Sequence, residues 1–308
     1  MTRIATSSAQ QSALADIMRA QRELNSAQRQ LSSGKKADQL KGYGGEAEAL
    51  TATRAVLARE TSYIEASKRL QARLDVQALA ISQVSDIASE LRQSLTEALG
   101  LDDGRTLMAR MEDLVSRGSA ALNTQFAGEY LFGGGRGDVP PFTANSLSDL
   151  AGAGPVTGMF QNGSIRSTAK LDDGQPHQTG VLADELGQAL MESLDRIKDF
   201  ADANGGDFSD PLTAAERTFL TNEIVSVSAA FDSISMVEAR NGMAQNQVDR
   251  AAESGESRKM ALEGLLSDLE DADMAAVATR VQQAKLALEA SAQVFSMLSR
   301  TSLLDFLR

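Results

Sequence analysis

The longest stretch of the chain without glycine or proline, residues 46–99, sets the strongest limit on the fold. Its apolar residues recur at alternating steps of three and four, which is the heptad spacing of a helix that packs lengthwise against another helix. A helix over this stretch is about 80 Å long at 1.5 Å per residue, which is too long for a compact globule. The stripe predicted to face a neighbouring helix consists of Leu57, Ile64, Gln71, Leu74, Gln77, Ile81, Val84, Ala88, Leu91 and Leu95.

Both ends of the chain carry a similar pattern. Residues 1–33 form a predicted helix that ends at Gly34, and residues 274–308 form another, with Asp273 as its N-cap. The second segment continues as an apolar run where most chains have polar, frayed residues, so we expect it to need a partner. The residues predicted to form an assembly interface are Ile4, Leu14, Ile17, Leu24, Leu31, Val277, Val281, Leu288, Phe295, Leu298, Leu303, Leu304 and Phe306.

The middle of the chain contains three more helical patterns and one irregular segment. The predicted helices cover residues 106–126, 181–203 and 211–269. For the last of them we expect Asp210 to be the N-cap and Pro211 the first helical residue. Residues 128–180 are instead rich in Gly, Pro, Ser and Asp, which indicates an irregular, β-containing insert. Its predicted strands are Tyr130-Leu131-Phe132 and Met159-Phe160.

These elements predict a mainly α fold with nested pairing. If the two terminal helices pair with each other, and residues 46–126 pair with 211–269, the result is an elongated rod of long antiparallel helices. Such a rod combines a terminal coiled coil and a helical bundle with a small β-containing insert domain at the tip. The predicted domains are a terminal coiled coil from residues 1–41 and 271–308, a helical rod from 42–127 and 181–270, and an insert from 128–180.

Composition excludes several classes of protein. The net charge is −12, but residues 1–41 carry a net +4 and residues 274–308 a net +2. An acidic middle between two mildly basic ends lacks the concentrated basic face that binds nucleic acid. The chain has no cysteine, so a disulfide or a thiolate metal site is impossible. We also find no apolar run long enough to span a membrane and no apolar core of a cleavable signal peptide near the start.

No motif predicts catalysis or a cofactor. Gly34-Lys35 lacks the second glycine and the Ser/Thr of a phosphate loop, so we interpret it as a helix C-cap. His177 is the only histidine and has no nucleophile motif beside it. Four carboxylates precede the last predicted helix, and they are Asp268, Glu270, Asp271 and Asp273. Negative charge at this place stabilises a helix N-terminus. We therefore expect no enzymatic activity, no cofactor and no metal.

Several segments carry a familiar pattern, and they are Met1-Thr2-Arg3-Ile4, Leu31-Ser32-Ser33-Gly34-Lys35-Lys36, Leu122-Asn123-Thr124, Gly128-Glu129-Tyr130-Leu131-Phe132-Gly133-Gly134, Pro141-Phe142, Asp271-Ala272-Asp273-Met274 and Ser302-Leu303-Leu304-Asp305-Phe306-Leu307. With them the chain resembles the flagellin superfamily and, within it, the family of hook–filament junction proteins, the third hook-associated proteins. The likeness covers roughly residues 1–142 and 211–308. The final Arg308 is closer to filament flagellins, so both kinds of subunit stay open.

The resemblance implies a structural subunit of the bacterial flagellum. Such a subunit is exported unfolded through the flagellum's own channel, with an export chaperone and without a cleavable signal peptide. It then assembles outside the cell with copies of itself and with related subunits, hook-associated proteins and flagellin. We favour the hook–filament junction; filament flagellin is the alternative, and a cytoplasmic coiled-coil adaptor is a second alternative that the heptads alone permit.

A simple balance of energies supports assembly through the terminal helices. Burying about six apolar side chains of one helix stabilises it by about 12 kcal/mol, at about 2 kcal/mol each. Ordering the residues of the last predicted helix costs about 1–2 kcal/mol per residue. Summed over the helix, this cost is larger than the stabilisation from burial. We therefore expect the terminal helices to be mobile in the isolated molecule and ordered after assembly.

Overall fold

The computed structural model describes residues 2–152, 154–172, 174 and 176–306, with only the backbone at 2–7, 10 and 298–306. Its regular structure consists of seven α-helices and two two-stranded sheets, so the prediction of a mainly α fold is confirmed. The chain divides into two compact units. We call Met1–Arg59 with Ser257–Arg308 the terminal unit, and Glu60–Glu256 the central unit.

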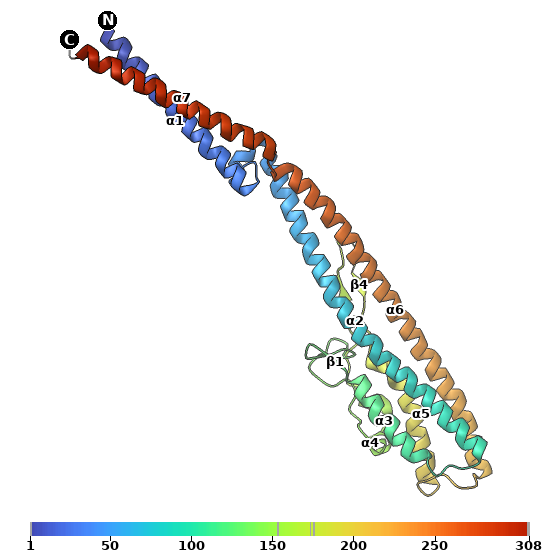
Figure 1. Cartoon of the computed structure of the whole chain (residues 1–308). Helices are drawn as coiled ribbons and strands as arrows, with labels where there is room; N and C mark the ends of the chain where they lie inside the picture. Colours follow the sequence, from blue (N-terminus) through green and yellow to red (C-terminus); the bar gives the residue numbers. More distant parts are fainter. Residues whose placement is uncertain (1, 153, 173, 175, 307–308) are drawn as a thin grey trace. The chain divides into compact units, whose positions relative to one another are not determined.

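In the terminal unit, α1 (Thr2–Ser33) and α7 (Met274–Phe306) lie side by side and antiparallel (Figure 1). The predicted pairing of the two terminal helices is therefore confirmed. Gly34 ends α1, because its N–H donates to the carbonyl of Gln30 at 2.9 Å and its φ of +72° is left-handed. Asp273 precedes α7 as predicted, and its carboxylate accepts hydrogen bonds from the backbone N–H groups of the second and third helical residues.

A short 3-10 helix, η1 (Leu40–Glu46), follows α1 and leads into α2 (Ala47–Leu101). The first residues of α2 belong to the terminal unit, and the rest belong to the central unit. The other long helix, α6 (Ala214–Glu270), is divided in the same way and ends in the terminal unit. Both long helices were predicted from the sequence, and their existence and approximate bounds are confirmed.

The central unit is a bundle in which α2 and α6 run side by side, with α3 (Leu107–Leu122) and α5 (Ala183–Ala203) packed against them (Figure 1). Gln77 of α2 donates to Asn241 of α6 at 2.8 Å, and both side chains are buried. The remaining elements are short, and they are β1 (Gln125–Phe126), β2 (Glu129–Tyr130), α4 (Leu147–Gly152), η2 (Val156–Met159), β3 (Thr168–Ala169) and β4 (His177–Gln178). β1 pairs with β2, and β3 pairs with β4, both antiparallel.

The core of the central unit lies between these helices. Most of the α2 stripe predicted from heptad spacing is buried, with the partly buried Leu57 and Gln71 as the exceptions. Two glycines lie where α3 and α5 pack closely. A Cβ atom on Gly118 would lie 2.5 Å from the Cε atom of Met191, and one on Gly187 would lie 2.8 Å from a Cδ atom of Leu122. The side chains that fill this core include Ile81, Val84, Leu91, Leu95, Met111, Leu122, Leu190, Leu194, Ile197, Leu220, Val227 and Ile234.

The predicted start of α6 is wrong. The helix begins at Ala214, and neither Asp210 nor Pro211 lies at its N-terminus as expected. Thr213 and Glu216 instead form a capping box: the Thr213 hydroxyl accepts from the N–H of Glu216 at 3.2 Å, and the Glu216 carboxylate accepts from the N–H of Thr213 at 2.6 Å. Thr213 therefore occupies the N-cap position that was predicted for Asp210.

The irregular segment also differs from its prediction in detail. Tyr130 lies in a strand, whereas Leu131 and Phe132 lie outside it, with both side chains buried in the core. Met159 ends η2, and Phe160 forms an isolated bridge with Phe142 rather than a strand.

The helix predicted to end near residue 126 ends at Leu122. The side chain of Asn123 donates to the carbonyl of Phe142 at 2.8 Å and accepts from its N–H at 3.0 Å, which draws the chain away from the helix axis.

The capping box gives a first test. Thr213→Ala removes the hydroxyl that caps α6 and should lower the free energy of unfolding by about 1 kcal/mol. Thr218→Ala is the matched control, since the Thr218 hydroxyl is exposed and donates to a carbonyl within the helix, and we expect a change below about 0.5 kcal/mol. Urea unfolding followed by circular dichroism measures both, and equal losses would show that the cap does not stabilise α6.

Candidate assembly interface

The contact between α1 and α7 is formed largely by alanines. Ala13, Ala20 and Ala27 are buried at intervals of seven residues along α1, and Val277 and Ala284 are buried at the same interval along α7. Heptad spacing keeps one side of each helix in contact with the other over several turns. We call these five residues the alanine seam.

The structure places the predicted interface residues in different surroundings. Val277 is buried in the seam, whereas Leu14 and Leu31 are 43 % and 41 % exposed. The partly buried members flank the seam, and they are Ile17, Leu24, Val281, Leu288 and Phe295. The side chains outside the described residues are those of Ile4, Leu298, Leu303, Leu304 and Phe306. Whether these residues bind other subunits stays a prediction.

The structure shows which face of α1 contacts α7. Two heptad frames overlap on this helix and share Ile17 and Leu24. The frame with the larger side chains contains Leu14 and Leu31 of the predicted assembly interface, and the structure turns the alanine frame toward α7. Small side chains let two helices approach closely, so the alanine frame gives the tighter pair. The recurrence of alanine at every seventh position is the feature of the sequence that indicates this contact face.

Large apolar side chains are exposed on the outside of the helix pair. Leu14 and Met18 lie exposed on α1, and Met274, Leu286 and Val294 lie exposed on α7. Leu286 is 66 % exposed although leucine is usually buried. These exposed side chains are available for contact with another protein surface.

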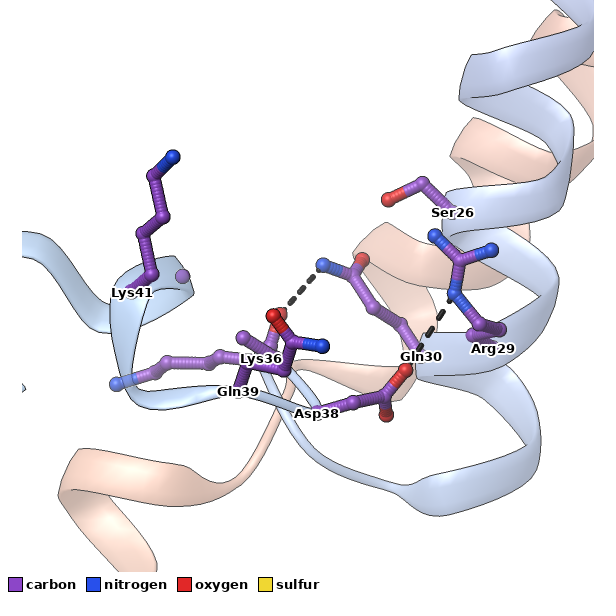
Figure 2. Close-up of a pocket in the computed structure, with 9 residues that line it drawn as sticks. Ser26, Arg29, Gln30, Lys36, Asp38, Gln39 and Lys41 are labelled. Atoms are coloured by element: carbon purple, nitrogen blue, oxygen red, sulfur yellow. Dashed lines mark hydrogen bonds and ion pairs between the residues drawn. The ribbon is translucent and has the colours of Figure 1, made fainter.

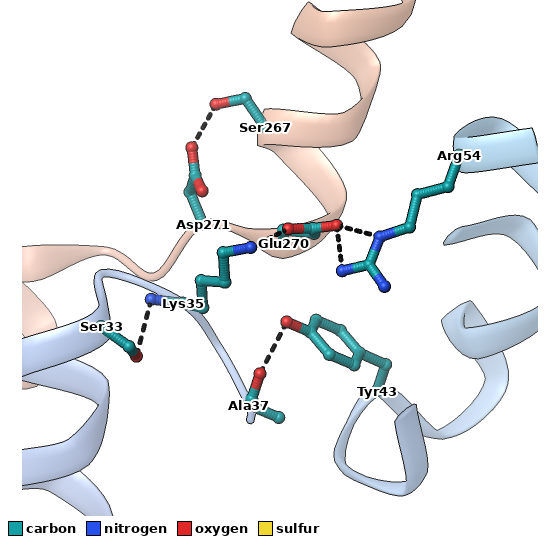
Figure 3. A network of polar contacts seen from close by, with 8 residues as sticks. All are labelled: Ser33, Lys35, Ala37, Tyr43, Arg54, Ser267, Glu270 and Asp271. Carbon is teal, nitrogen blue, oxygen red and sulfur yellow. Dashed lines mark hydrogen bonds and ion pairs between the residues drawn. The ribbon is translucent and has the colours of Figure 1, made fainter. Parts of the chain in front are cut away.

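A buried carboxylate joins three segments of the terminal unit, as Figure 3 shows. Glu270, at the end of α6, is only 4 % exposed. It accepts from the Nζ atom of Lys35 at 2.7 Å and from the Nε atom of Arg54, on α2, at 2.6 Å. Beside this network, the Tyr43 hydroxyl donates to the carbonyl of Ala37 at 2.8 Å and closes the loop between α1 and α2.

Backbone hydrogen bonds reinforce the same connection. The N–H of Lys36 donates to the carbonyl of Glu270 at 2.7 Å, and the N–H of Ala272 donates to the carbonyl of Gly34 at 2.8 Å. Lys35 and Asp271 therefore form an antiparallel bridge where α1 ends and α7 begins. Two backbone bonds and the ion pair between Lys35 and Glu270 thus hold the segment between α6 and α7 to the end of α1.

The carboxylate cluster predicted to support the start of the last helix needs correction. Asp273 does cap α7, but Glu270 faces Lys35 and Arg54, and the exposed Asp271 hydrogen-bonds Ser267. Lys35 and Arg54 are far from Glu270 in the sequence, so local spacing could not reveal this network.

Opposite charges shift the pKa values of Glu270 and Lys35. The Lys35 ammonium, which donates to the carboxylate, holds the pKa of Glu270 below its ordinary value, and Arg54 acts in the same direction against the effect of burial. Glu270 in turn raises the pKa of Lys35 above its ordinary value. The pair is therefore fully charged near neutral pH.

An open groove of about 660 Å³ lies beside the end of α1, bordered by Arg29, Lys36 and Lys41 (Figure 2). Asp38 partly balances this charge, with 3.4 Å between its carboxylate and the Nε atom of Arg29. The side chain of Gln30 donates to the carbonyl of Lys36 at 2.7 Å and shapes one wall. The Nζ atom of Lys36 donates to the carbonyl of Asp268 at 2.7 Å.

Among the described residues, no group of three or more His, Asp or Glu side chains is arranged to hold a metal ion. No helix in that part of the chain is long and apolar enough to cross a membrane.

Comparison with known families decides the class of protein. A model of the bacterial flagellin N-terminal helical region matches residues 4–136, and a model of the bacterial flagellin C-terminal helical region matches residues 224–307. Together they cover well over half of the chain. The chain belongs to the flagellin family. It is a structural subunit of the bacterial flagellum, as the sequence predicted, and it assembles with other flagellar subunits.

Solved structures show the same fold. A protein of Vibrio parahaemolyticus, provisionally named as a flagellar hook-associated protein, is similar with a TM-score of 0.59 and 13% identity, over 73% of this chain and 97% of that one. The crystal structure of Bacillus cereus FlgL is similar with a TM-score of 0.53 and 18% identity, over 70% of this chain and 98% of that one. No curated protein matches the chain in sequence.

The Glu270 network gives a test with a defined pH dependence. Because folding lowers the pKa of Glu270, its carboxylate stabilises the fold above its unfolded value, near 4.5, and this contribution is lost as the pH falls through the folded value. Glu270→Gln should therefore cost about 1–2 kcal/mol at pH 7, since Lys35 and Arg54 are half exposed. The difference from the wild type should shrink below about pH 4.5.

Thermal unfolding at several pH values measures this difference. Asp271→Asn is the control, because Asp271 is exposed and adjacent to Glu270, and its side chain hydrogen-bonds Ser267 rather than Lys35 or Arg54. A loss that stays constant from pH 7 to pH 3 would show that the charge of Glu270 does not stabilise the fold.

Proposed function

We propose that this flagellar subunit assembles at the hook–filament junction through the outer faces of α1 and α7. One observation carries the proposal: the helix pair has a narrow alanine seam inside and large apolar side chains, such as Leu286, outside. The names of the two structural relatives support the junction as the location.

The seam is too thin to hold both helices in order by itself. Burying one methyl group of alanine stabilises a helix pair by about 0.8 kcal/mol, whereas fixing each backbone residue costs about 1–2 kcal/mol. Neighbouring subunits that cover Leu286 and Val294 would add the missing apolar burial. We infer that the helix pair opens readily in the isolated subunit and becomes ordered in the assembly.

The proposal extends to partners and location. The subunit acts outside the cell, in contact with hook-associated proteins and flagellin, and it has no catalytic step. It is exported in the unfolded state with the help of a chaperone and without a cleavable signal peptide. Nucleic acid and membranes are not among its proposed partners, because its surface is acidic and its apolar residues are spaced for helix packing.

Filament flagellin is the alternative, because both matched family models describe flagellin ends. Electron microscopy of the purified protein separates the two functions. A junction subunit should form no long filaments alone but should bind the ends of flagellin filaments, whereas a filament subunit should polymerise alone.

The assembly interface is tested at Leu286. Leu286→Asp places a charge on the exposed outer face, so the isolated protein should keep the wild-type helical content, while co-assembly with flagellin should fall at least about tenfold. Phe295→Asp is less suitable, since Phe295 is partly buried beside the seam and its change would also disturb the helix pair. Sedimentation of filaments with bound subunit measures co-assembly.

Leu286→Met is the matched control. It keeps an apolar side chain of similar volume and should co-assemble like the wild type. Normal co-assembly of Leu286→Asp would show that this face of α7 is not an interface.

A further inference from the structure

The side of α1 opposite the alanine seam is basic. Arg19, Arg22, Ser26 and Arg29 follow one another at steps of three, four and three residues, so they share one side of the helix. All four residues are exposed. Arg19 pairs with Asp16 at 3.2 Å and Arg29 with Asp38 at 3.4 Å, whereas Arg22 makes no ion pair among the described residues. The groove bordered by Arg29, Lys36 and Lys41 continues this basic face at the end of the helix (Figure 2).

The outer side of α5, in the central unit, has the opposite charge at the same spacing. Glu192, Asp195, Asp199 and Asp202 also follow at steps of three, four and three, on the side away from the buried residues of the helix. Asp202 pairs with Lys198 of the same helix, whereas neither Asp195 nor Asp199 forms an ion pair in the described part of the chain. Asp195 is partly buried, and this burial first, and the nearby Asp199 carboxylate second, raise its pKa above its ordinary value. A cation that approaches both carboxylates would offset their mutual repulsion.

The net charges of the two units differ in sign. The terminal unit holds 15 Lys/Arg and 12 Asp/Glu, a net +3, whereas the central unit holds 15 Lys/Arg and 30 Asp/Glu, a net −15. Two copies of this chain therefore attract each other when the terminal unit of one approaches the central unit of the other.

We propose that the basic face of α1 docks against the acidic face of α5 of a second copy of this chain. Each face spans about 15 Å at 1.5 Å per residue, so the three arginines can lie opposite three of the four carboxylates, with Ser26 opposite the fourth. If the helices run parallel, Arg22 lies opposite Asp195; if they run antiparallel, it lies opposite Asp199. The inference rests on the proposed function, because it requires that copies assemble.

The contact sets the register of neighbouring copies more than their affinity. An exposed ion pair contributes about 0.2–1 kcal/mol, which is small beside the burial of apolar side chains. Charged faces instead guide the encounter and penalise arrangements in which like charges meet. A polyanion could also bind the basic face of α1, but its binding would not depend on α5. Dependence on the acidic face of α5 therefore distinguishes docking of a second copy from binding of a polyanion.

Disulfide cross-linking tests the contact directly, because the chain contains no cysteine. Full-length Arg22→Cys is mixed with Asp195→Cys and, separately, with Asp199→Cys, with an affinity tag on one partner, and oxidised under assembly conditions. We expect a disulfide-linked heterodimer in one of the two mixtures, which also gives the helix direction. Asp232→Cys, an exposed position on α6, is the matched control and should give no heterodimer above background.

Charge reversal provides a second measurement. Arg22→Glu should weaken self-association of the full chain roughly fivefold in sedimentation velocity. Arginine in place of Asp195 or Asp199, whichever cross-links, should restore it when combined with Arg22→Glu, because each copy then carries the reversed pair.

The outcomes separate the docking contact from the proposed function. If the wild type self-associates but neither mixture cross-links above the control, the docking contact is wrong and the proposed function stands. If the wild type does not self-associate yet joins flagellin filaments, the docking contact again fails alone. If it does neither, both proposals fail.

Discussion

The alanine seam between α1 and α7 limits how stable the terminal helices can be without a partner. Ala13, Ala20 and Ala27 bring the helices close together but bury little apolar surface. The larger side chains that could have widened the contact, such as Leu286, are exposed instead. If the two helices buried all their apolar side chains against each other, neighbouring subunits could add no further apolar burial. A seam that buries little apolar surface, together with apolar outer faces, therefore favours assembly over folding of the isolated chain.

The central unit shows the opposite balance, and the contrast explains how one chain can be both stable and able to assemble. Four helices surround fully buried residues such as Leu91 and Leu194, and the Gln77–Asn241 hydrogen bond fixes the position of α2 against α6. Buried polar pairs of this kind specify one register, because a shifted register leaves them without partners. The central unit can therefore fold before assembly, while the terminal helices depend on it.

Sequence periodicity predicted the long helices well, because their packing repeats along the chain and leaves a regular stripe. It could not decide where the choice depended on a partner. The two frames of α1 share Ile17 and Leu24, and only the fit against α7 decides between them. Similarly, the two partners of Glu270 lie 235 and 216 residues away in the sequence, so its charge looked like part of a local cluster. The capping box at Thr213 was readable but competed with a more conspicuous Asp-Pro pair.

Charge and apolar surface act at different distances when subunits meet. Electrostatic attraction extends about one Debye length, roughly 8 Å at physiological ionic strength, whereas apolar side chains stabilise a complex only in contact. On α1 the two kinds of surface are neighbours, since Met18 lies one turn before Arg22. A partner guided to the arginines is therefore brought against the exposed apolar side chains in a defined register. Without the charges, the same apolar faces would bind in several registers, because heptad contacts shifted by seven residues are nearly equivalent.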